Sequence, residues 1–170
     1  MGQWESDRYS NVGFKFGDLE RAARIQYTPE TCWAAAMSSA SVLLGVAEKD
    51  NQLTWYTMAR RYGFLGEGTT RIQPDALKKF LDGLPSFKVD ACTTIAALAA
   101  ALGPALRDDK IVLMFSAGHV VLLGQMQLEK GANAVGHSYH VVDPAVGARS
   151  WSQADLNAFT LIDGMIVART

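Results

Sequence analysis

The sequence lacks the features that mark membrane, metal-binding and nucleic-acid-binding proteins. None of its apolar runs approaches the roughly 20 residues that a helix needs to cross a bilayer. It holds no CxxC, no HExxH and no cluster of His and Cys at zinc spacing, so we expect no structural metal. The formal net charge is -1 and no block of one sign stands out, so we expect neither nucleic acid nor a membrane as a partner.

Cysteines are also few, and no secretory leader is visible. The start, MGQWESDRYS, has no basic head followed by an apolar run, so we expect no signal peptide and a cytoplasmic protein unless another route carries it out. In such a chain Cys32 and Cys92, which are far apart, are more often two free thiols than a disulfide, although one disulfide is the alternative.

What is present is the composition of a soluble globular domain. Apolar residues make up 49% and charged residues 19% of the 170 residues, a length typical of one domain with a substantial core. We expect a single domain over residues 1–170, with residues 1–24 as a candidate N-terminal extension because they are mixed and polar.

Helical patterns dominate the first two thirds of the chain. In CWAAAMSSASVLLG, which starts at Cys32, apolar residues recur at the spacing of a helix with one buried face, and the small side chains are typical of a central helix. Thr28 or Thr31 is expected to cap this helix. Three further helices are expected in QLTWYTMARRYG, in PDALKKFLDG and from about Thr94 to Arg107. Pro104 is expected to bend or end the last of them early.

Strand patterns fill the last third. IVLMFS is a continuous apolar run of strand length, and HVVLLGQMQ and SYHVVDP follow it as a hairpin joined by LEKGANAVG. WSQADLNAF indicates a short helix, LIDGMIVA a last strand, and NVGFKFG a short strand near the start. Helices first and strands after predict an α+β fold.

Cys32 is the first candidate for chemistry, because it lies in the first turn of the central helix. Unpaired N–H groups and the helix dipole favour a negative charge there, and the thiolate is the nucleophilic form of a cysteine. The alternative is an inert buried thiol, since free cysteines are among the most buried residues. Gln26, six residues earlier, could donate its side-chain N–H to an oxyanion beside the sulfur. Cys92 also precedes a helix, but it has no such Gln or Trp, so we interpret it as inert.

The arrangement of Gln26, five further residues and Cys32-Trp33 resembles that of the papain-like cysteine peptidases. Within that group it is most similar to bacterial papain-fold effector proteases, whose cysteine motif also runs into a small-residue helix. Glu-Thr stands where the cathepsins have small residues, so the chain is not a close cathepsin relative. The resemblance implies a papain-like α+β fold, with a helical half packed against an antiparallel β-sheet half and the active-site cleft between them.

The resemblance also implies a histidine on one strand and an Asn or Asp on the next. Gly118-His119 opens the strand HVVLLGQ, and Asp143 ends the strand expected to pair with it. Two strand-end residues on one face of an antiparallel pair can lie within hydrogen-bond reach. Asp143 could instead only open an Asp-Pro turn. His137 and His140 are the alternatives to His119, although neither is followed by a comparable buried strand.

The activity that the resemblance implies is that of a cysteine endopeptidase acting on a protein substrate through Cys32, His119 and Asp143. Gln26 would complete the oxyanion hole, and no cofactor or metal is required. The resemblance further implies a bacterial effector or toxin, delivered by a secretion system into a target cell, with a cognate immunity or inhibitor protein as a partner. The alternatives are a side-chain deamidase, transglutaminase or acyltransferase with the same triad, and a non-catalytic binding module. We also expect the loop GFLGEGTT to line the cleft and Trp151 to shield the Asp–His hydrogen bond.

Overall fold

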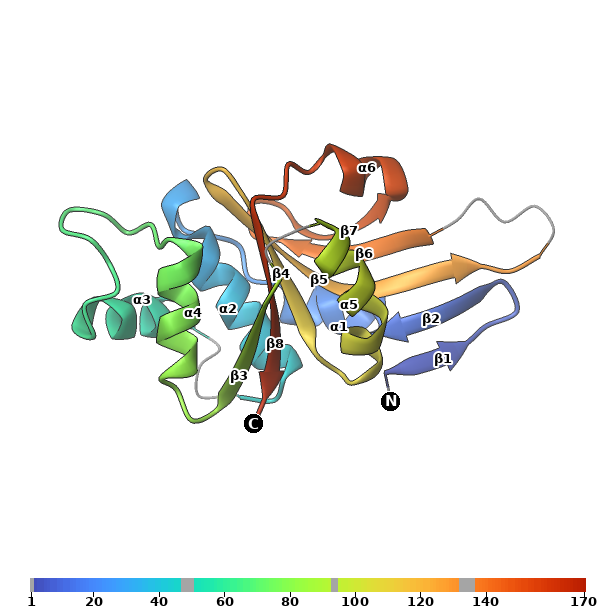
Figure 1. Ribbon diagram of the computed structural model, residues 1–170, viewed down its shortest axis with the longest axis horizontal. Helices are drawn as coiled ribbons and strands as arrows, with labels where there is room; N and C mark the ends of the chain where they lie inside the picture. The colour runs from blue at the N-terminus through green and yellow to red at the C-terminus, as the bar shows by residue number, and fades with distance from the viewer. Residues whose placement is uncertain (1, 47–50, 93–94, 132–136) are drawn as a thin grey trace.

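The computed structural model describes residues 2–46, 51–92, 95–131 and 137–170, without the side chains of residues 91–96 and 99 (Figure 1). Its helices are α1 (Phe16–Ala22), α2 (Cys32–Leu43), α3 (Gln52–Arg61), α4 (Pro74–Asp82), α5 (Ile95–Arg107) and α6 (Gln153–Ala158), with a 3-10 turn, η1 (Pro29–Thr31), before α2. Its strands are β1 (Gln3–Glu5), β2 (Tyr9–Gly13), β3 (Phe87–Cys92), β4 (Ile111–Ser116), β5 (His119–Glu129), β6 (His137–Asp143), β7 (Gly147–Ser152) and β8 (Asp163–Arg169). Among these described residues, no helix has the length and apolar character needed to cross a membrane.

The strands of the described residues form one antiparallel sheet, which curls into a half-barrel. Its order is β1-β2-β5-β4-β8-β3, and β6 joins it through β5 and carries β7 on its other side. The 11-residue β5 pairs with β4 near its start, with β2 near its end and with β6 over most of its length. The strand that begins at His119 is therefore fixed by three neighbours.

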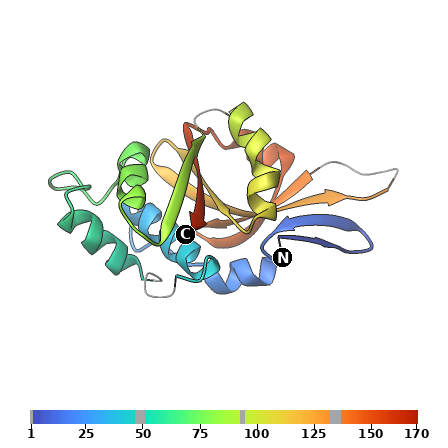
Figure 2. The ribbon, with the colours of Figure 1, turned by 60° about the horizontal axis from the view of Figure 1, so that its bottom comes forward.

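Helices cover the sheet on both faces, which explains the continuous apolar runs of the strands. In β4, Ile111 and Leu113 belong to one cluster of buried side chains, and Val112 and Met114 belong to the other. Successive side chains of a strand point to opposite faces, so a strand with two covered faces reads as an unbroken apolar run. α2, α3 and α4 contribute to the first cluster, and α5 lies over the opposite face (Figure 2).

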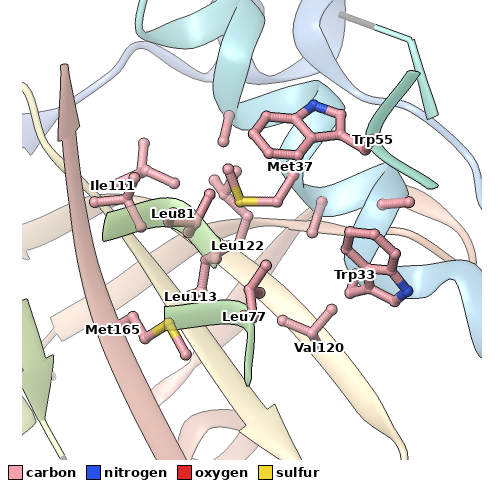
Figure 3. Close-up of a cluster of buried hydrophobic side chains, with 14 of the residues drawn as sticks. Trp33, Met37, Trp55, Leu77, Leu81, Ile111, Leu113, Val120, Leu122 and Met165 are labelled. Carbon is pink, nitrogen blue, oxygen red and sulfur yellow. The ribbon is translucent and has the colours of Figure 1, made fainter. Parts of the chain in front are cut away.

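α2 is the centre of the first cluster, into which Trp33 and Met37 project (Figure 3). The sequence predicted one buried face for this helix, but every side chain from Cys32 to Ser41 is buried. The difference arises because alanine and serine are small enough for α1, α3 and β5 to pack closely on several sides. The buried serine hydroxyls remain satisfied, since each donates to the backbone carbonyl four residues earlier.

The sequence predicted that Pro104 bends its helix or ends it early; the early end is wrong, and the bend stays a prediction. α5 continues to Arg107, and the Asp108 N–H still donates to the Pro104 carbonyl. A proline so near a helix end removes one backbone hydrogen bond, while Leu102 and Leu106 hold the helix on the second cluster. The predicted start of this helix at Thr94, and residues 132–136 of the predicted hairpin connection, lie outside the described residues.

The candidate N-terminal extension is part of the fold. β2 pairs with β5, β1 pairs with β2, and α1 packs against α2, so residues 3–22 extend the sheet and cover the central helix. The strand expected at NVGFKFG starts earlier, at Tyr9, and α1 begins at Phe16. β3 and β7 were also not predicted. Each pairs with a single neighbour at a margin of the sheet, where burial selects the sequence only weakly.

Candidate active site

Cys32 is the first residue of α2, directly after η1. The predicted cap, Thr31, precedes it, but its hydroxyl turns back to Thr28: it accepts from the Thr28 N–H at 3.1 Å and donates to the Thr28 carbonyl at 3.0 Å. Thr31 therefore caps none of the N–H groups in the first turn of α2 with its side chain. Those N–H groups remain able to stabilise negative charge near the sulfur. Cys32 is a free thiol that is only 6% exposed.

His119 and Asp143 meet at one end of the β5–β6 pair. His119 begins β5 and Asp143 ends β6, and because the strands are antiparallel these two ends lie side by side. His119 Nε2 and Asp143 Oδ1 are 2.8 Å apart, with the two side chains 29% and 20% exposed. Since the carboxylate engages Nε2, Nδ1 is the ring nitrogen that is left for the Cys32 thiol.

The surroundings of His119 favour its protonated form. The hydrogen bond with Asp143, followed by that with the Cys32 thiol, raises the pKa of His119 from 6.5 to about 9, against the opposing effect of burial. The imidazole is therefore a cation at neutral pH. An imidazolium in contact with a thiol stabilises the thiolate, which is the form that attacks a carbonyl.

Asp143 is held by its own turn as well as by the histidine. Its Oδ1 accepts a 2.9 Å hydrogen bond from the Ala145 N–H in addition to the contact with His119. Burial opposes ionisation of the carboxyl, but these hydrogen bonds outweigh it and keep the pKa of Asp143 below its ordinary value. The turn and the histidine contact were alternatives in the sequence. The structure combines them, because one carboxylate oxygen serves both.

Gln26 lies beside the same turn. Its backbone N–H donates to the Pro144 carbonyl at 2.8 Å, which ties the segment before α2 to the strand end that carries Asp143. The neighbouring Ile25 carbonyl accepts from the Gln52 side chain of α3 at 2.5 Å. Gln26 Oε1 is buried and has no hydrogen-bond partner among the described residues. The role of its side-chain N–H₂ in an oxyanion hole beside Cys32 stays a prediction.

The other two histidines are placed elsewhere. His140 Nδ1 is hydrogen-bonded to Gln125 Oε1, and its ring packs against Phe16 with 4.7 Å between centroids. Burial lowers the pKa of His140 and so favours the neutral form of this ring. His137 is exposed beside Tyr139. It is His119 that the structure brings to Asp143.

Trp151 does not shield the Asp–His hydrogen bond as predicted. It pairs with Tyr139 across the β6–β7 ladder and packs against Phe159, with 5.6 Å between ring centroids. Asp143 pairs with Gly147, four residues before Trp151, which is about 13 Å along a strand. The side chain of Cys92 lies outside what the structure describes, so the interpretation of this thiol as inert stays a prediction.

Cys32 and His119 line a cavity of about 150 Å³ between the helices and the sheet. Its wall is formed on the helical side by Cys32, Trp33 and residues 71–74, and on the sheet side by residues 115–120 and Ile162. A larger hollow, of about 660 Å³, is lined by residues 27–31, Ala34, Gln52, Leu53, Tyr56 and Thr70. Arg71 lines both spaces.

The glycine-rich loop reaches this region through its last residue. The indole N–H of Trp33 donates to the Thr70 carbonyl at 2.8 Å, and Thr70 lines the larger hollow. Arg71, which follows Thr70, was missed in the sequence. Its only signal there was its position directly after a loop with several glycines.

No protein-family model matches the sequence, and no curated protein matches it significantly. Within the residues that the structure describes, no group of three or more His, Cys, Asp or Glu side chains could hold a metal ion. A free thiol, an imidazolium and a carboxylate follow one another at the head of a buried helix, beside a cavity.

Proposed function

We propose that this protein is a papain-like cysteine protease that cleaves a protein substrate. The observation that carries the proposal is the placement of His119, which lies 2.8 Å from the carboxylate of Asp143 and lines the same cavity as the free thiol at the head of α2. A nucleophile, a base and a group that orients the base are the arrangement by which covalent catalysis is recognised.

In the proposed mechanism, the Cys32 thiolate attacks the carbonyl carbon of the scissile bond. The oxyanion that forms accepts hydrogen bonds from the Cys32 backbone N–H and from the amide of Gln26. The His119 imidazolium then protonates the leaving amine, which departs and leaves a thioester on Cys32. A water molecule gives a proton to the now neutral imidazole and attacks the thioester, which releases the acyl group as a carboxylic acid and restores the thiolate–imidazolium pair.

The placement of the three groups supports a papain-like arrangement. The thiol comes from a central helix, whereas the imidazole and the carboxylate come from two neighbouring antiparallel strands. The 150 Å³ cavity has one wall from the helical side and one from the sheet. The backbone hydrogen bond from Gln26 to Pro144 joins the two sides directly at the site.

The biological setting of the proposal rests on the resemblance of the cysteine motif to that of bacterial effector proteases. On that basis we propose a toxin or effector that acts on a protein inside a target cell. The cell that makes it would then need an immunity or inhibitor protein that covers the site.

The test is a survey of new protein N-termini in a bacterial lysate treated with the protein, with Cys32→Ala or with His119→Ala. His137→Ala is the matched control, since His137 is an exposed histidine outside the site. We expect new N-termini with the wild-type protein and with His137→Ala, and none with the other two variants. New termini that persist with Cys32→Ala would refute the proposal.

A deamidase, a transglutaminase or an acyltransferase would use the same thiol and pass through the same thioester. If the lysate gains no N-termini while Cys32 is reactive, intact mass changes on lysate proteins would identify such an enzyme. An unreactive Cys32 in the folded protein would favour a non-catalytic binding module.

A further inference from the structure

Arg71 is a cation beside the proposed catalytic residues that the mechanism above does not use. It shares the 150 Å³ cavity with Cys32 and His119 and also lines the 660 Å³ hollow. Its guanidinium lies against Gly118, the residue before His119. Nη1 is 3.0 Å from the point where a Cβ on Gly118 would stand, and Gly118 has a φ of +84°. A glycine at this position both permits the backbone conformation and leaves space for the guanidinium.

The backbone of Arg71 is anchored close to the nucleophile. The preceding carbonyl, of Thr70, accepts the hydrogen bond from the indole of Trp33, and the Arg71 N–H donates to Thr69 Oγ1 at 3.1 Å. Trp33 directly follows Cys32 in α2. The guanidinium therefore extends from a segment that is tied to the residue next to the reactive sulfur.

The guanidinium of Arg71 is free to bind a ligand. It is exposed, and it forms no ion pair or side-chain hydrogen bond with another described residue. Glu30, an acid that shares the larger hollow, accepts instead from the Thr70 hydroxyl at 2.8 Å. A planar guanidinium without a partner matches the two oxygens of a carboxylate.

We propose that Arg71 binds a carboxylate of the substrate next to the bond that Cys32 attacks. This inference rests on the proposed function, and it names the substrate class: polypeptides with an acidic side chain, or the carboxylate of a chain terminus, near the scissile bond. Arg71 acts as a specificity residue in this scheme, since it touches the substrate and takes no part in the proton transfers.

The first test compares two alkylating reagents that differ by one carboxylate. With each of them, the Cys32 thiolate displaces iodide and forms a thioether, but iodoacetate is an anion and iodoacetamide is neutral. The second-order rate constants at Cys32, followed by peptide mass mapping, give the ratio of iodoacetate to iodoacetamide reactivity. This ratio requires no knowledge of the natural substrate.

We expect Arg71→Gln to lower this ratio about tenfold, because a charge-assisted hydrogen bond to the carboxylate is lost. Arg71→Lys should retain part of the ratio, since it keeps the charge without the planar fork. Arg61→Gln, at the exposed end of α3, is the matched control and should leave the ratio unchanged. A ratio in Arg71→Gln equal to that of the wild type would overturn the inference and leave the proposed function standing.

Failure of the proposed function and failure of the inference about Arg71 give different results in this experiment. If Cys32 reacts with neither reagent in the folded protein, but reacts with both after unfolding, then the proposed nucleophile is wrong and the inference about Arg71 falls with it. If Cys32 reacts with both reagents and the ratio is the same in the wild type and in Arg71→Gln, only the proposed carboxylate site is contradicted.

Synthetic peptides built on a sequence that the protein cuts separate the two sources of the carboxylate. One pair exchanges Asp for Asn beside the scissile bond, and another exchanges a free C-terminal acid for an amide. We expect one of these changes to lower kcat/KM about tenfold in the wild type and to have little effect in Arg71→Gln. Equal kcat/KM values within both pairs would overturn the inference.

Discussion

α2 and α5 are both rich in alanine and have nearly the same length, 12 and 13 residues, but their surroundings differ. α2 is buried on every side from Cys32 to Ser41. Along α5, buried and exposed side chains alternate. The buried ones are Leu98, Leu102, Ala105 and Leu106, and the exposed ones are Ala97, Ala100, Pro104 and Arg107. Between α5, the sheet and α6 there is also a hollow of about 480 Å³, lined mainly by apolar side chains. Similar composition thus yields one helix inside the protein and one on its surface.

The difference bears on the catalytic role proposed for α2, because a helix rich in small residues does not indicate such a role by its composition. Alanine and serine let other elements approach α2 closely, and the approach brings the β5–β6 pair to the head of the helix. The residues outside the helix then decide the chemistry, because His119 and Asp143 are what Cys32 meets there. Helical composition alone would not distinguish α2 from α5.

The largest expected effect is on kcat/KM, and it should come from removing the charge of Asp143 near the head of α2. Asp143→Asn keeps the size of the side chain but withdraws the carboxylate that orients and stabilises the imidazolium. We expect kcat/KM to fall about 10²- to 10⁴-fold while the protein remains folded. Asp90→Asn, an exposed position on β3, is the control and should have no effect. A loss of less than tenfold in Asp143→Asn would argue against the triad.

The packing of the two helices can be compared with one matched pair of substitutions. Ala36→Leu adds volume where α2 is fully buried, and Ala100→Leu adds the same volume on the exposed side of α5. Alanine and leucine have similar helix propensities, so the difference reports packing. We expect Ala36→Leu to lower the free energy of unfolding by about 1–3 kcal/mol and Ala100→Leu to leave it nearly unchanged, measured by urea denaturation. Equal changes in the free energy of unfolding would mean that the surroundings of α2 can accommodate a larger side chain.

The pH dependence of kcat/KM tests the electrostatics at the head of α2. The pKa of His119 is raised to about 9, so the imidazolium persists through neutral pH and is lost as the pH rises through 9. Its contribution to stability follows the same sign: it is complete below the ordinary pKa of 6.5 and disappears as the pH rises through about 9. We expect kcat/KM for a peptide substrate to fall above pH 9, and this alkaline limb to move to lower pH in Asp143→Asn. An NMR titration of the His119 ring that ends near pH 6.5 would contradict the proposed pairing.

The smallest expected effect is on the free energy of unfolding, and it should come from a substitution in α5, whose surroundings are more open. A Cβ added to Gly103 would lie 3.7 Å from the Met126 side chain and 3.8 Å from that of Arg107, which is ordinary contact. Gly103→Ala should therefore stabilise the protein by less than the ~1 kcal/mol of helix propensity alone, because Pro104 crowds the helical backbone of a preceding residue that carries a Cβ. Gly124→Ala is the opposite case, since its Cβ would lie 2.5 Å from a methyl carbon of Leu19 and should destabilise the protein. Thermal or urea unfolding of the two variants checks both signs.

The sequence predicted the elements that are buried on both sides, and for a physical reason. β4, β5 and β8 lie between two clusters of apolar side chains, so their residues must be apolar on both faces and the pattern is strong. β7 is different: in GARSWS most side chains are partly or fully exposed, and little in the sequence marks it as a strand. The same argument explains why one buried face was predicted for α2, since its alanines and serines do not reveal how many neighbours they will have.

The residues of the candidate site also differ in how far the sequence could predict them. Cys32 carries a local signal, because a helix start and the Gln-x5-Cys-Trp spacing can be read from adjacent residues. His119 and Asp143 could be paired because each stands at the end of a recognisable strand, and their side chains lie 2.8 Å apart. Arg71 could not be found in this way. Its position against Gly118 depends on a contact between residues 47 apart in the sequence, which no local pattern encodes.

The position of β8 has a consequence for how the protein is made. This strand, Asp163–Arg169, is the last of the described fold, yet it lies between β3 and β4 in the sheet. During translation, Cys32, His119 and Asp143 are therefore synthesised before the strand that joins β3 to β4. The long-range pairing of β8 must wait for the end of this segment. A nascent chain stalled before Asp163 cannot complete the sheet, and in the proposed protease this delays a competent site until synthesis has passed β8.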